Sequence, residues 1–331
     1  MSQNAAIETN ELSKTFKDRT GPVHAVRGVD LCVLPGEIFG FLGPNGAGKS
    51  TTLRMLTTLL PIDGGEAYVA GVDVARRPDA VRRRIGFVGQ AGGADLPATG
   101  WENLILQGQL YGASREGAVK RATELVELLD LTEFADRKAA TYSGGQRRRL
   151  EIALGIMHRP EVLFLDEPTT GLDPQNRANL WQHLRELRAQ GTTIFLTTHY
   201  LEEADALADR VAIIDHGRIV AEGSPHTLKQ QLAGDSVILK PRSGVIPLDV
   251  LFHELCGQQY VRDGYIEDDA IRLYVANGTG TLPHIFELLK QRNVEIETIS
   301  LSEPSLDDVF LQTTGRSQRD AGHSQPEDVA A

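Results

Sequence analysis

The sequence predicts an α/β fold, in which a large domain built on a doubly wound sheet is followed by a small α+β domain. Three observations carry this prediction. A glycine-rich loop joins an apolar run to an amphipathic segment at 38–60, apolar runs and helical patterns alternate from about 160 to 220, and the hydrophobic pattern changes near residue 235. At 331 residues the chain is long enough for both domains.

The glycine-rich loop has the form G-x-x-x-x-G-K-[ST], which binds phosphate. It follows an apolar run, 38–42, and precedes a segment with helical spacing, 51–60. Its glycines let several backbone N–H groups turn toward one phosphate chain, and the helix N-terminus adds partial positive charge. Lys49 would reach the β- and γ-phosphates, and the Ser50 hydroxyl would bind Mg²⁺. A glycine-rich turn that binds nothing is disfavoured by the flanking strand and helix. The predicted nucleotide-binding residues are Gly43, Pro44, Asn45, Gly46, Ala47, Gly48, Lys49, Ser50 and Thr51.

A second apolar run, 162–165, ends in two carboxylates, Asp166 and Glu167. Ligands of open α/β sheets bind at the carboxyl ends of the strands, so Asp166 is placed to hold Mg²⁺ directly or through water. Glu167 is the next residue and points differently, so it can polarise an attacking water as general base. A strand that ends in two solvated acids is the alternative, and the preceding phosphate loop argues against it.

A third motif opens a helix about ninety residues after the phosphate loop. Ser143, Gly144, Gly145 and Gln146 precede apolar residues at helical spacing. A chain in which the phosphate loop is followed by this third motif resembles the ATP-binding cassette (ABC) superfamily. The match extends from about 7 to 232, with every motif present once.

Two departures from the commonest ABC pattern narrow the resemblance. Tyr142 stands where leucine is usual, and Gly89 stands where proline is frequent. Both resemble the ABC subunits that energise drug and antibiotic efflux, of the daunorubicin/doxorubicin-resistance type. The implied fold is a P-loop NTPase with a RecA-like core, an antiparallel β-layer and a helical subdomain, and the implied nucleotide is ATP.

The resemblance assigns roles to further single residues. Gln90 is similar to the Q-loop glutamine that senses Mg²⁺ and the γ-phosphate, and His199 is similar to the H-loop histidine that contacts the γ-phosphate. Asp173 resembles the D-loop aspartate along the dimer seam. Phe16 stands where the family places an aromatic ring that stacks on adenine. A structural histidine at position 199 and a core or surface aromatic at position 16 are the alternatives.

Besides the nucleotide-binding residues given above and Phe16, the predicted site residues have three roles. Catalysis is assigned to Lys49, Gln90, Glu167 and His199, Mg²⁺ binding to Ser50, Gln90 and Asp166, and contact with the ATP of a partner subunit to Ser143, Gly144, Gly145, Gln146 and Asp173.

The partners follow from the single set of motifs. In the family, Ser143 and Gly145 face the ATP held by a second cassette, so we expect a homodimer with two ATP molecules at its seam. Every apolar run is well short of the roughly 20 residues that cross a bilayer. A transporter built with this chain therefore needs a separate membrane permease. We expect a peripheral protein at the cytoplasmic face of the membrane, with no secretory signal and with Cys32 and Cys256 reduced.

We expect the ABC domain over 7–233, the accessory α+β domain over 235–313 and a disordered tail over 314–331. The antiparallel layer should lie within 7–85 and the helical subdomain within 95–157.

The glycine-rich stretch 91–94 predicts a hinge after Gln90. In the family, the groove beside this loop receives a permease helix. Trp101, Leu104 and Tyr111 are either exposed contacts in that groove or residues packed inside the helical subdomain.

The accessory domain shows strand-like alternation at 271–276, helical spacing at 282–289 and alternation again at 294–297. Ser305 can cap a final helix, with Asp308 closing the capping box. The domain would support the dimer, contact the permease or act as a stabilising appendage.

The main alternative function is a soluble ABC ATPase acting on nucleic acid or ribosomes. The net charge of −11 disfavours binding to a phosphate backbone, so we interpret the run Arg147–Arg149 as a solvated face with local salt bridges.

Repair and chromosome members insert coiled coils or zinc modules between the two motifs, and translation factors carry two cassettes; this chain has neither feature. An unrelated P-loop kinase or GTPase has no use for the third motif. The branch resemblance favours export over import, and the sequence identifies neither the substrate nor the permease.

Overall fold

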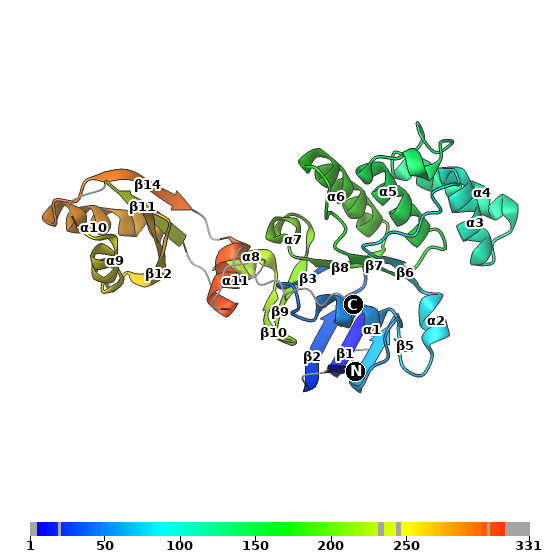
Figure 1. Cartoon of the computed structure of the whole chain (residues 1–331), viewed down its shortest axis with the longest axis horizontal. Coiled ribbons are helices and arrows are strands. Elements are labelled where there is room, and N and C mark those ends of the chain that lie inside the picture. Colours follow the sequence, from blue (N-terminus) through cyan, green and yellow to red (C-terminus); the bar gives the residue numbers. More distant parts are fainter. Residues whose placement is uncertain (1–4, 19–20, 231–234, 243–245, 303–304, 315–331) are drawn as a thin grey trace. The chain divides into compact units, whose positions relative to one another are not determined.

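The computed structural model describes residues 5–18, 21–230, 235–242, 246–302 and 305–314. They form two compact units, which divide between Gly223 and Ser224 (Figure 1). The sequence placed this division between residues 233 and 235, and residues 231–234 lie outside the described ones. The expected disordered tail also lies outside them, except Thr314, which ends the last helix.

A six-stranded sheet of order β10-β9-β3-β8-β7-β6 forms the centre of the first unit. All its neighbouring strands are parallel except the pair β9–β10. Three central strands, β3, β7 and β8, are buried along their whole length, because helices or a second sheet cover both faces. The strands are β3 (Ile38–Leu42), β6 (Ile85–Val88), β7 (Val162–Asp166), β8 (Thr193–Thr198), β9 (Arg210–Asp215) and β10 (Arg218–Gly223).

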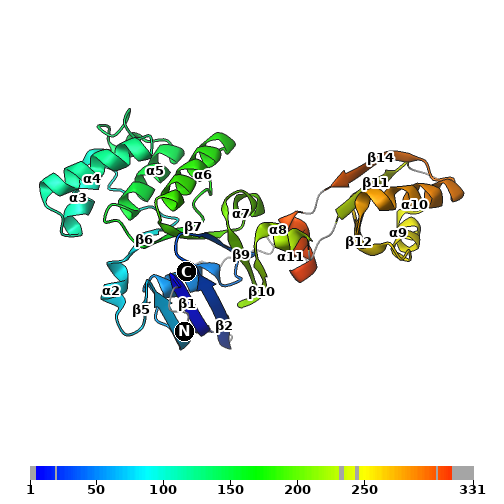
Figure 2. The ribbon, with the colours of Figure 1, turned by 180° about the vertical axis from the view of Figure 1, so that it is seen from behind.

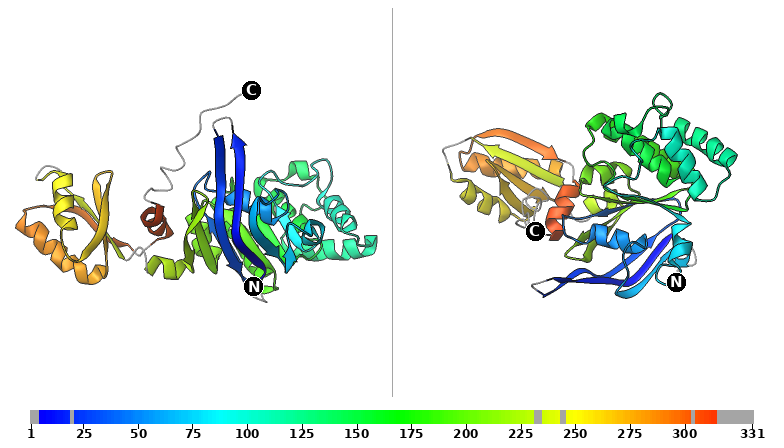
Figure 3. Two further views of the ribbon diagram at one scale, coloured as in Figure 1. Left: turned by 90° about the horizontal axis from the view of Figure 1, so that it is seen from below. Right: turned by 45° about the vertical axis from the view of Figure 1, so that its right-hand side comes forward.

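A four-stranded antiparallel sheet of order β2-β1-β4-β5 lies on one side of the central sheet (Figure 3). One hydrophobic cluster joins this layer to helix α1 and to the central strands, through residues such as Val29, Leu53 and Phe195. The expected antiparallel layer is therefore present. Its elements are β1 (Ile7–Asp18), β2 (Gly21–Val33), β4 (Gly64–Val69) and β5 (Val72–Asp73), with α1 (Lys49–Leu56) and α2 (Pro78–Arg82) in the same part of the chain.

The expected helical subdomain lies on the opposite side of the central sheet (Figures 1 and 2). Its core includes Leu104, Leu125 and Leu150 from three helices. Leu104 is fully buried and Trp101 packs against the same core, whereas Tyr111 is 44% exposed and stacks on His158. Its helices are α3 (Gly100–Leu110), α4 (Arg115–Leu128), η1 (Ala139–Thr141) and α5 (Gly144–Gly155). Two further helices, α6 (Pro174–Ala189) and α7 (Leu201–Leu207), follow the strands β7 and β8.

The second unit is the expected small α+β domain. Its antiparallel sheet has the order β12-β13-β11-β14, and its core includes Val237, Leu255, Leu273 and Ile285. The predicted alternation at 271–276 corresponds to β13, and the helical spacing at 282–289 corresponds to α10. The elements are α8 (Pro225–Leu228), β11 (Asp235–Pro241), α9 (Leu248–Cys256), β12 (Val261–Glu267), β13 (Ala270–Val275), α10 (Gly278–Gln291), β14 (Ile296–Ser302) and α11 (Leu306–Thr314).

The predicted capping box of α11 is present. Ser305 Oγ accepts a hydrogen bond from the Asp308 N–H at 3.2 Å, and Asp308 Oδ2 accepts one from the Ser305 N–H at 2.9 Å. The buried Asp308 also accepts a hydrogen bond from Tyr274 Oη at 2.6 Å and lies 3.5 Å from Arg272 Nη1. Burial, followed by this carboxylate, raises the pKa of Tyr274. Asp308 therefore holds the last helix against strand β13.

Both cysteines, Cys32 and Cys256, are free and partly buried. Among the helices of the described ranges, none has the length and apolarity to span a membrane.

A close backbone contact between β6 and α5 generates a stability prediction. A Cβ atom at Gly86 would lie 2.2 Å from the carbonyl oxygen of Gly155, the last residue of α5. We therefore expect Gly86→Ala to lower the free energy of unfolding by about 1–3 kcal/mol through overpacking. Urea unfolding measures this loss. Gly93→Ala is the matched control, because its Cβ would meet nothing within 4 Å; equal stability of the two variants would contradict the prediction.

Candidate functional site

The phosphate loop begins where β3 ends, and its glycines are sterically required. A Cβ at Gly43 would lie 2.3 Å from the carbonyl oxygen of Ile214. Gly48 caps α1 with φ of 110°, a left-handed conformation that side chains disfavour. The backbone therefore curls as a phosphate cradle requires, directly before a helix N-terminus.

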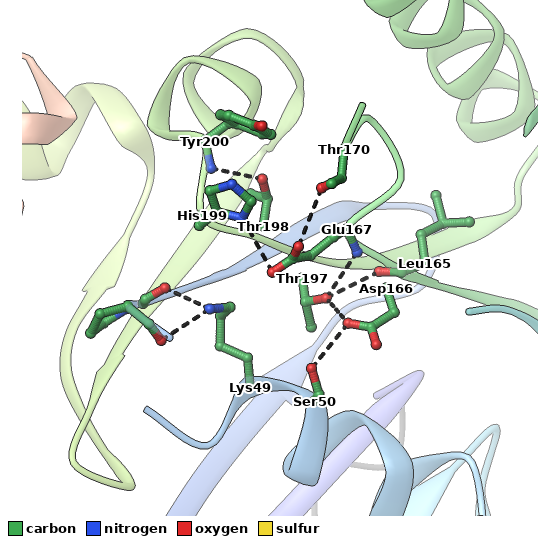
Figure 4. Close-up of polar contacts among 12 residues, drawn as sticks. Lys49, Ser50, Leu165, Asp166, Glu167, Thr170, Thr197, Thr198, His199 and Tyr200 are labelled. Atoms are coloured by element: carbon green, nitrogen blue, oxygen red, sulfur yellow. Dashed lines mark hydrogen bonds and ion pairs between the residues drawn. The ribbon is translucent and has the colours of Figure 1, made fainter. Parts of the chain in front are cut away.

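Lys49 is buried, and its side chain folds back onto the loop. Its Nζ donates hydrogen bonds to the carbonyl oxygens of Gly43 at 2.7 Å and Pro44 at 3.1 Å (Figure 4). Burial lowers the pKa of Lys49, and the negative charges of Glu167 and Asp166 oppose that shift. A cation is thus held inside the curl of the loop, where an anionic ligand would complete its charge balance.

Asp166 lies opposite the loop, with its Oδ1 surrounded by hydroxyl groups. Thr197 Oγ1 donates a hydrogen bond to this oxygen at 2.6 Å, and Ser50 Oγ donates one at 3.3 Å. Neighbouring ligands of an octahedral Mg²⁺ lie roughly 2.9 Å apart, so the hydroxyl–carboxylate pair Ser50–Asp166 fits two adjacent positions. Gln90 lines the same cavity of about 630 Å³ as Asp166. Across the described ranges, no cluster of three or more His, Cys, Asp or Glu residues forms a metal site.

Glu167 has an unusual backbone conformation for a residue with a side chain, with φ of 47°. This left-handed conformation costs about 1–2 kcal/mol. Its N–H is held by the carbonyl oxygen of Thr197 at 3.0 Å and by Thr197 Oγ1 at 3.2 Å. The Glu167 carboxylate is thereby turned away from that of Asp166, as the sequence predicts.

The Glu167 side chain contacts two further polar groups. His199 Nδ1 lies 3.2 Å from Oε1, and Thr170 Oγ1 donates a hydrogen bond to Oε2 at 3.2 Å (Figure 4). His199 lowers the pKa of Glu167 most, burial opposes it, and Lys49 and Thr170 lower it further. The carboxylate is therefore kept ionised, which is the state that can accept a proton.

Ser143, Gly144, Gly145, Gln146 and Asp173 lie at the N-termini of two neighbouring helices, α5 and α6. Ser143 caps α5 in a capping box with Gln146, and Asp173 caps α6. The two caps touch each other: a Cβ at Gly145 would lie 2.3 Å from Oδ1 of Asn176, which bonds to Asp173. Within the described residues, no hydrogen bond joins this group to the phosphate loop.

Two predicted positions are clarified by the structure. Phe16 lies on β1 and is 40% exposed, so a core position is excluded; Lys14 Nζ lies 5.8 Å from its ring centre. Tyr142, where leucine is usual, donates a hydrogen bond to the Phe134 carbonyl oxygen at 2.7 Å. The hydroxyl that this departure adds is thus satisfied inside the helical subdomain.

The sequence analysis missed two residues of the site, Thr197 and Arg148. The interpretation of Arg147–Arg149 as a solvated face is wrong for Arg148, which is only 7% exposed, and for Arg149, whose side chain is only 15% exposed. Arg148 lies three residues before Glu151, and this spacing is the sequence signal of an ion pair along a helix. In the structure both residues are buried, because α5 is enclosed on nearly every side. For Thr197 the sequence signal was weaker: two threonines, Thr197 and Thr198, stand directly before His199.

Two family matches cover most of the chain. Residues 26–170 match the ABC transporter family, and residues 223–314 match the C-terminal domain of the DrrA1-3-like ATP-binding proteins.

Curated relatives match along nearly the full length. The chain is 45% identical to the daunorubicin resistance ATP-binding protein DrrA2 of Streptomyces coeruleorubidus, over 92% of this chain and 94% of that protein. It is 46% identical to the daunorubicin/doxorubicin resistance ATP-binding protein DrrA of Streptomyces peucetius, over 94% and 92%. It is 34% identical to the linearmycin resistance ATP-binding protein LnrL of Bacillus subtilis, over 95% and 100%.

Among solved structures, an ATP-binding cassette captured as a post-hydrolysis dimer with ADP and Pi is similar to this chain. The TM-score is 0.61 at 28% identity, and the match covers 66% of this chain and 98% of the other.

A buried acid beside the site generates a prediction. Glu203, on α7, is 0% exposed, accepts a hydrogen bond from Trp181 Nε1 at 3.4 Å, and has a pKa raised by burial. Because the pKa of Glu203 is higher in the folded than in the unfolded state, the wild type loses stability as the pH rises above the pKa that Glu203 has in the unfolded state. Glu203→Gln is uncharged at every pH. Its melting temperature should therefore rise relative to wild type between about pH 5 and pH 8.

Thermal unfolding at both pH values measures this difference. Glu202→Gln is the control, because the neighbouring Glu202 side chain is 83% exposed. A difference between Glu203→Gln and wild type that stays constant or shrinks with rising pH would contradict the prediction.

Proposed function

This chain is a member of the ATP-binding cassette family of transporter ATPases, and on that basis we propose that it powers export of an amphipathic drug, antibiotic or lipid through a separate membrane permease. Membership makes it an ATP hydrolase. The observation that carries the export proposal is that relatives named for daunorubicin resistance align with both the ATPase and the C-terminal domain.

The site residues divide the work of hydrolysis between binding and proton transfer. Lys49 neutralises the β- and γ-phosphates, and Ser50, Asp166 and Gln90 would hold Mg²⁺, which supplies further charge neutralisation when bound. Glu167 accepts a proton from the attacking water. Its strained backbone and the neighbouring His199 fix the direction of its carboxylate. Catalysis is thus mainly positioning and charge neutralisation.

Two copies of the chain would complete two sites. The N-terminus of α5, with Ser143 and Gly145, has no phosphate loop of its own chain to serve, and a helix N-terminus favours an anion. In the proposed homodimer each α5 N-terminus covers the γ-phosphate of the partner's ATP, with Asp173 along the seam. Phe16 would stack on adenine, because it is an exposed ring on the antiparallel layer.

The permease would bind beside the loop after Gln90. The cavity there is lined by exposed or partly exposed apolar side chains, including Leu59, Phe87 and Tyr111, with Arg54 and Arg82 among its polar residues. A permease helix with apolar and acidic residues fits these walls. This docking would hold the chain at the cytoplasmic face of the membrane. The C-terminal domain would support the dimer or contact the permease.

The alternative of action on nucleic acid or ribosomes has no support among the relatives described above, and the net charge of −11 also disfavours it.

Replacing the proposed base tests the ATPase mechanism. We expect Glu167→Gln to bind ATP, to form an ATP-dependent dimer on size-exclusion chromatography, and to release phosphate at least about 10²-fold more slowly than wild type. Glu161→Gln is the matched control, because Glu161 directly precedes strand β7, which Glu167 directly follows, and the Glu161 side chain is 60% exposed. Phosphate release by Glu167→Gln at the wild-type rate would rule out this base.

Affinity purification tests the transporter proposal. Tagged Glu167→Gln protein with ATP, purified from gently solubilised native membranes, should recover a multi-spanning membrane protein in similar amount, identified by mass spectrometry. Leu59→Glu in the same background should recover much less, because Leu59 is 58% exposed in the proposed docking cavity. Recovery of ribosomes, DNA-repair proteins or nothing would contradict the proposal.

A further inference from the structure

Arg148 lies within α5 and connects segments that are far apart in the sequence. Its guanidinium group donates four hydrogen bonds. Nε donates to the carbonyl oxygen of Pro168 at 2.9 Å, and Nη2 donates to that of Asp166 at 3.2 Å. Nη1 donates both to the carbonyl oxygen of Gly89 at 2.8 Å and to Glu151 Oε2 at 3.1 Å.

The acceptors Asp166 and Pro168 flank Glu167 on both sides. Glu167 is the residue with the strained left-handed backbone, and strain of this kind persists only where the surroundings fix it. Thr197 holds the N–H of Glu167, while Arg148 holds the carbonyl groups before and after it. The peptide group before Glu167 is thus held at both its N–H and its carbonyl oxygen, and the chain is held again at the carbonyl of the next residue, Pro168.

The acceptor Gly89 directly precedes Gln90. The counter-ion Glu151 supports the same loop two residues later, since a Cβ at Gly92 would lie 2.1 Å from Glu151 Oε1. The Arg148–Glu151 pair therefore fixes the start of the Gln90 loop as well as the Glu167 backbone.

We propose that Arg148, with Glu151 as its counter-ion, is a positioning residue that couples the N-terminus of α5 to Glu167 and Gln90 of the same chain. Arg148 follows Gly145 by three residues on one rigid helix. Any shift of α5 when Ser143 and Gly145 engage a partner's ATP is therefore transmitted to the peptide groups around Glu167. This proposal rests on the roles proposed above for Glu167 and for Ser143 and Gly145.

The chemistry requires arginine. Its planar guanidinium presents five N–H donors in fixed directions, whereas a lysine ammonium is a compact charge on a flexible stem. A lysine at position 148 can pair with Glu151 but cannot reach the carbonyl groups of Gly89, Asp166 and Pro168 together. Charge and geometry can therefore be separated by substitution.

The two neighbouring arginines provide matched controls. The Arg147 side chain is 49% exposed and lies 4.0 Å from Glu151. Arg149 is enclosed, but it donates hydrogen bonds to the carbonyl oxygens of Leu129 and Asp130, within the helical subdomain. Arg147 thus reports on surface charge, and Arg149 reports on stability alone.

The test compares ATP hydrolysis and thermal unfolding of Arg147→Gln, Arg148→Gln, Arg149→Gln and Arg148→Lys. We expect Arg148→Gln to lower kcat by about 10²-fold, the loss typical of a misplaced catalytic group, with KM for ATP changed less than about threefold. Arg148→Lys should melt close to the wild-type temperature and still have a low kcat. Arg147→Gln should resemble wild type, and Arg149→Gln should lose melting temperature but keep kcat.

A kcat of wild-type size in Arg148→Gln or in Arg148→Lys would overturn the proposal. Adding Arg148→Gln to Glu167→Gln should reduce the residual phosphate release by a smaller factor than Arg148→Gln reduces that of wild type, because part of the effect of Arg148 acts through Glu167; a fully multiplied loss would also overturn the proposal. Wild-type turnover by Glu167→Gln alone is a different failure, because it removes the proposed base itself.

Discussion

The parallel pairing of β3, β7 and β8 is the constraint on which the site depends. In this register Leu42 pairs with Thr198, and Asp166 pairs with Thr197. The carboxyl ends of these strands therefore lie together, and they carry the phosphate loop, the two carboxylates and His199. Stacked and tilted rings fix the register, because Phe195 packs against both Phe39 and Phe164. A slip by one residue would turn these rings, and the catalytic side chains with them, to the wrong face.

Buried charge is the second constraint, and around the site the fold compensates it locally at Lys49, at Asp166 and at the Arg148–Glu151 pair. Lys49 is enclosed by the carbonyl groups of its own loop, and Asp166 by hydroxyl groups. Arg148 and Glu151 neutralise each other. Removing one partner of such a set would leave a desolvated charge, so these residues hold the surrounding backbone in place as well as carrying charge.

The sequence predicted the elements whose patterns are local. Continuous apolar runs identified β3 and β7, and the glycine spacing identified the phosphate loop before Lys49. Ser305 and Asp308 identified the start of α11. In contrast, Arg148 was misread because its neighbours resemble a charged surface, and only the tertiary fold encloses α5 on nearly every side. The contribution of Thr197 depends on the register between two strands, which a single sequence does not specify.

Helix α5 belongs to two sites at once in the proposed dimer. Its N-terminus touches the cap of α6 through Gly145 and Asn176, and faces the partner's ATP. One turn later, Arg148 holds the peptide groups around Glu167 of its own chain. A rigid helix cannot adjust one end without moving the other. ATP bound by one chain therefore has a direct physical route to the general base of the other, through backbone hydrogen bonds rather than through a long conformational relay. In the proposed symmetric dimer the same route would run in both directions, so each site would reach full alignment only when the other holds nucleotide.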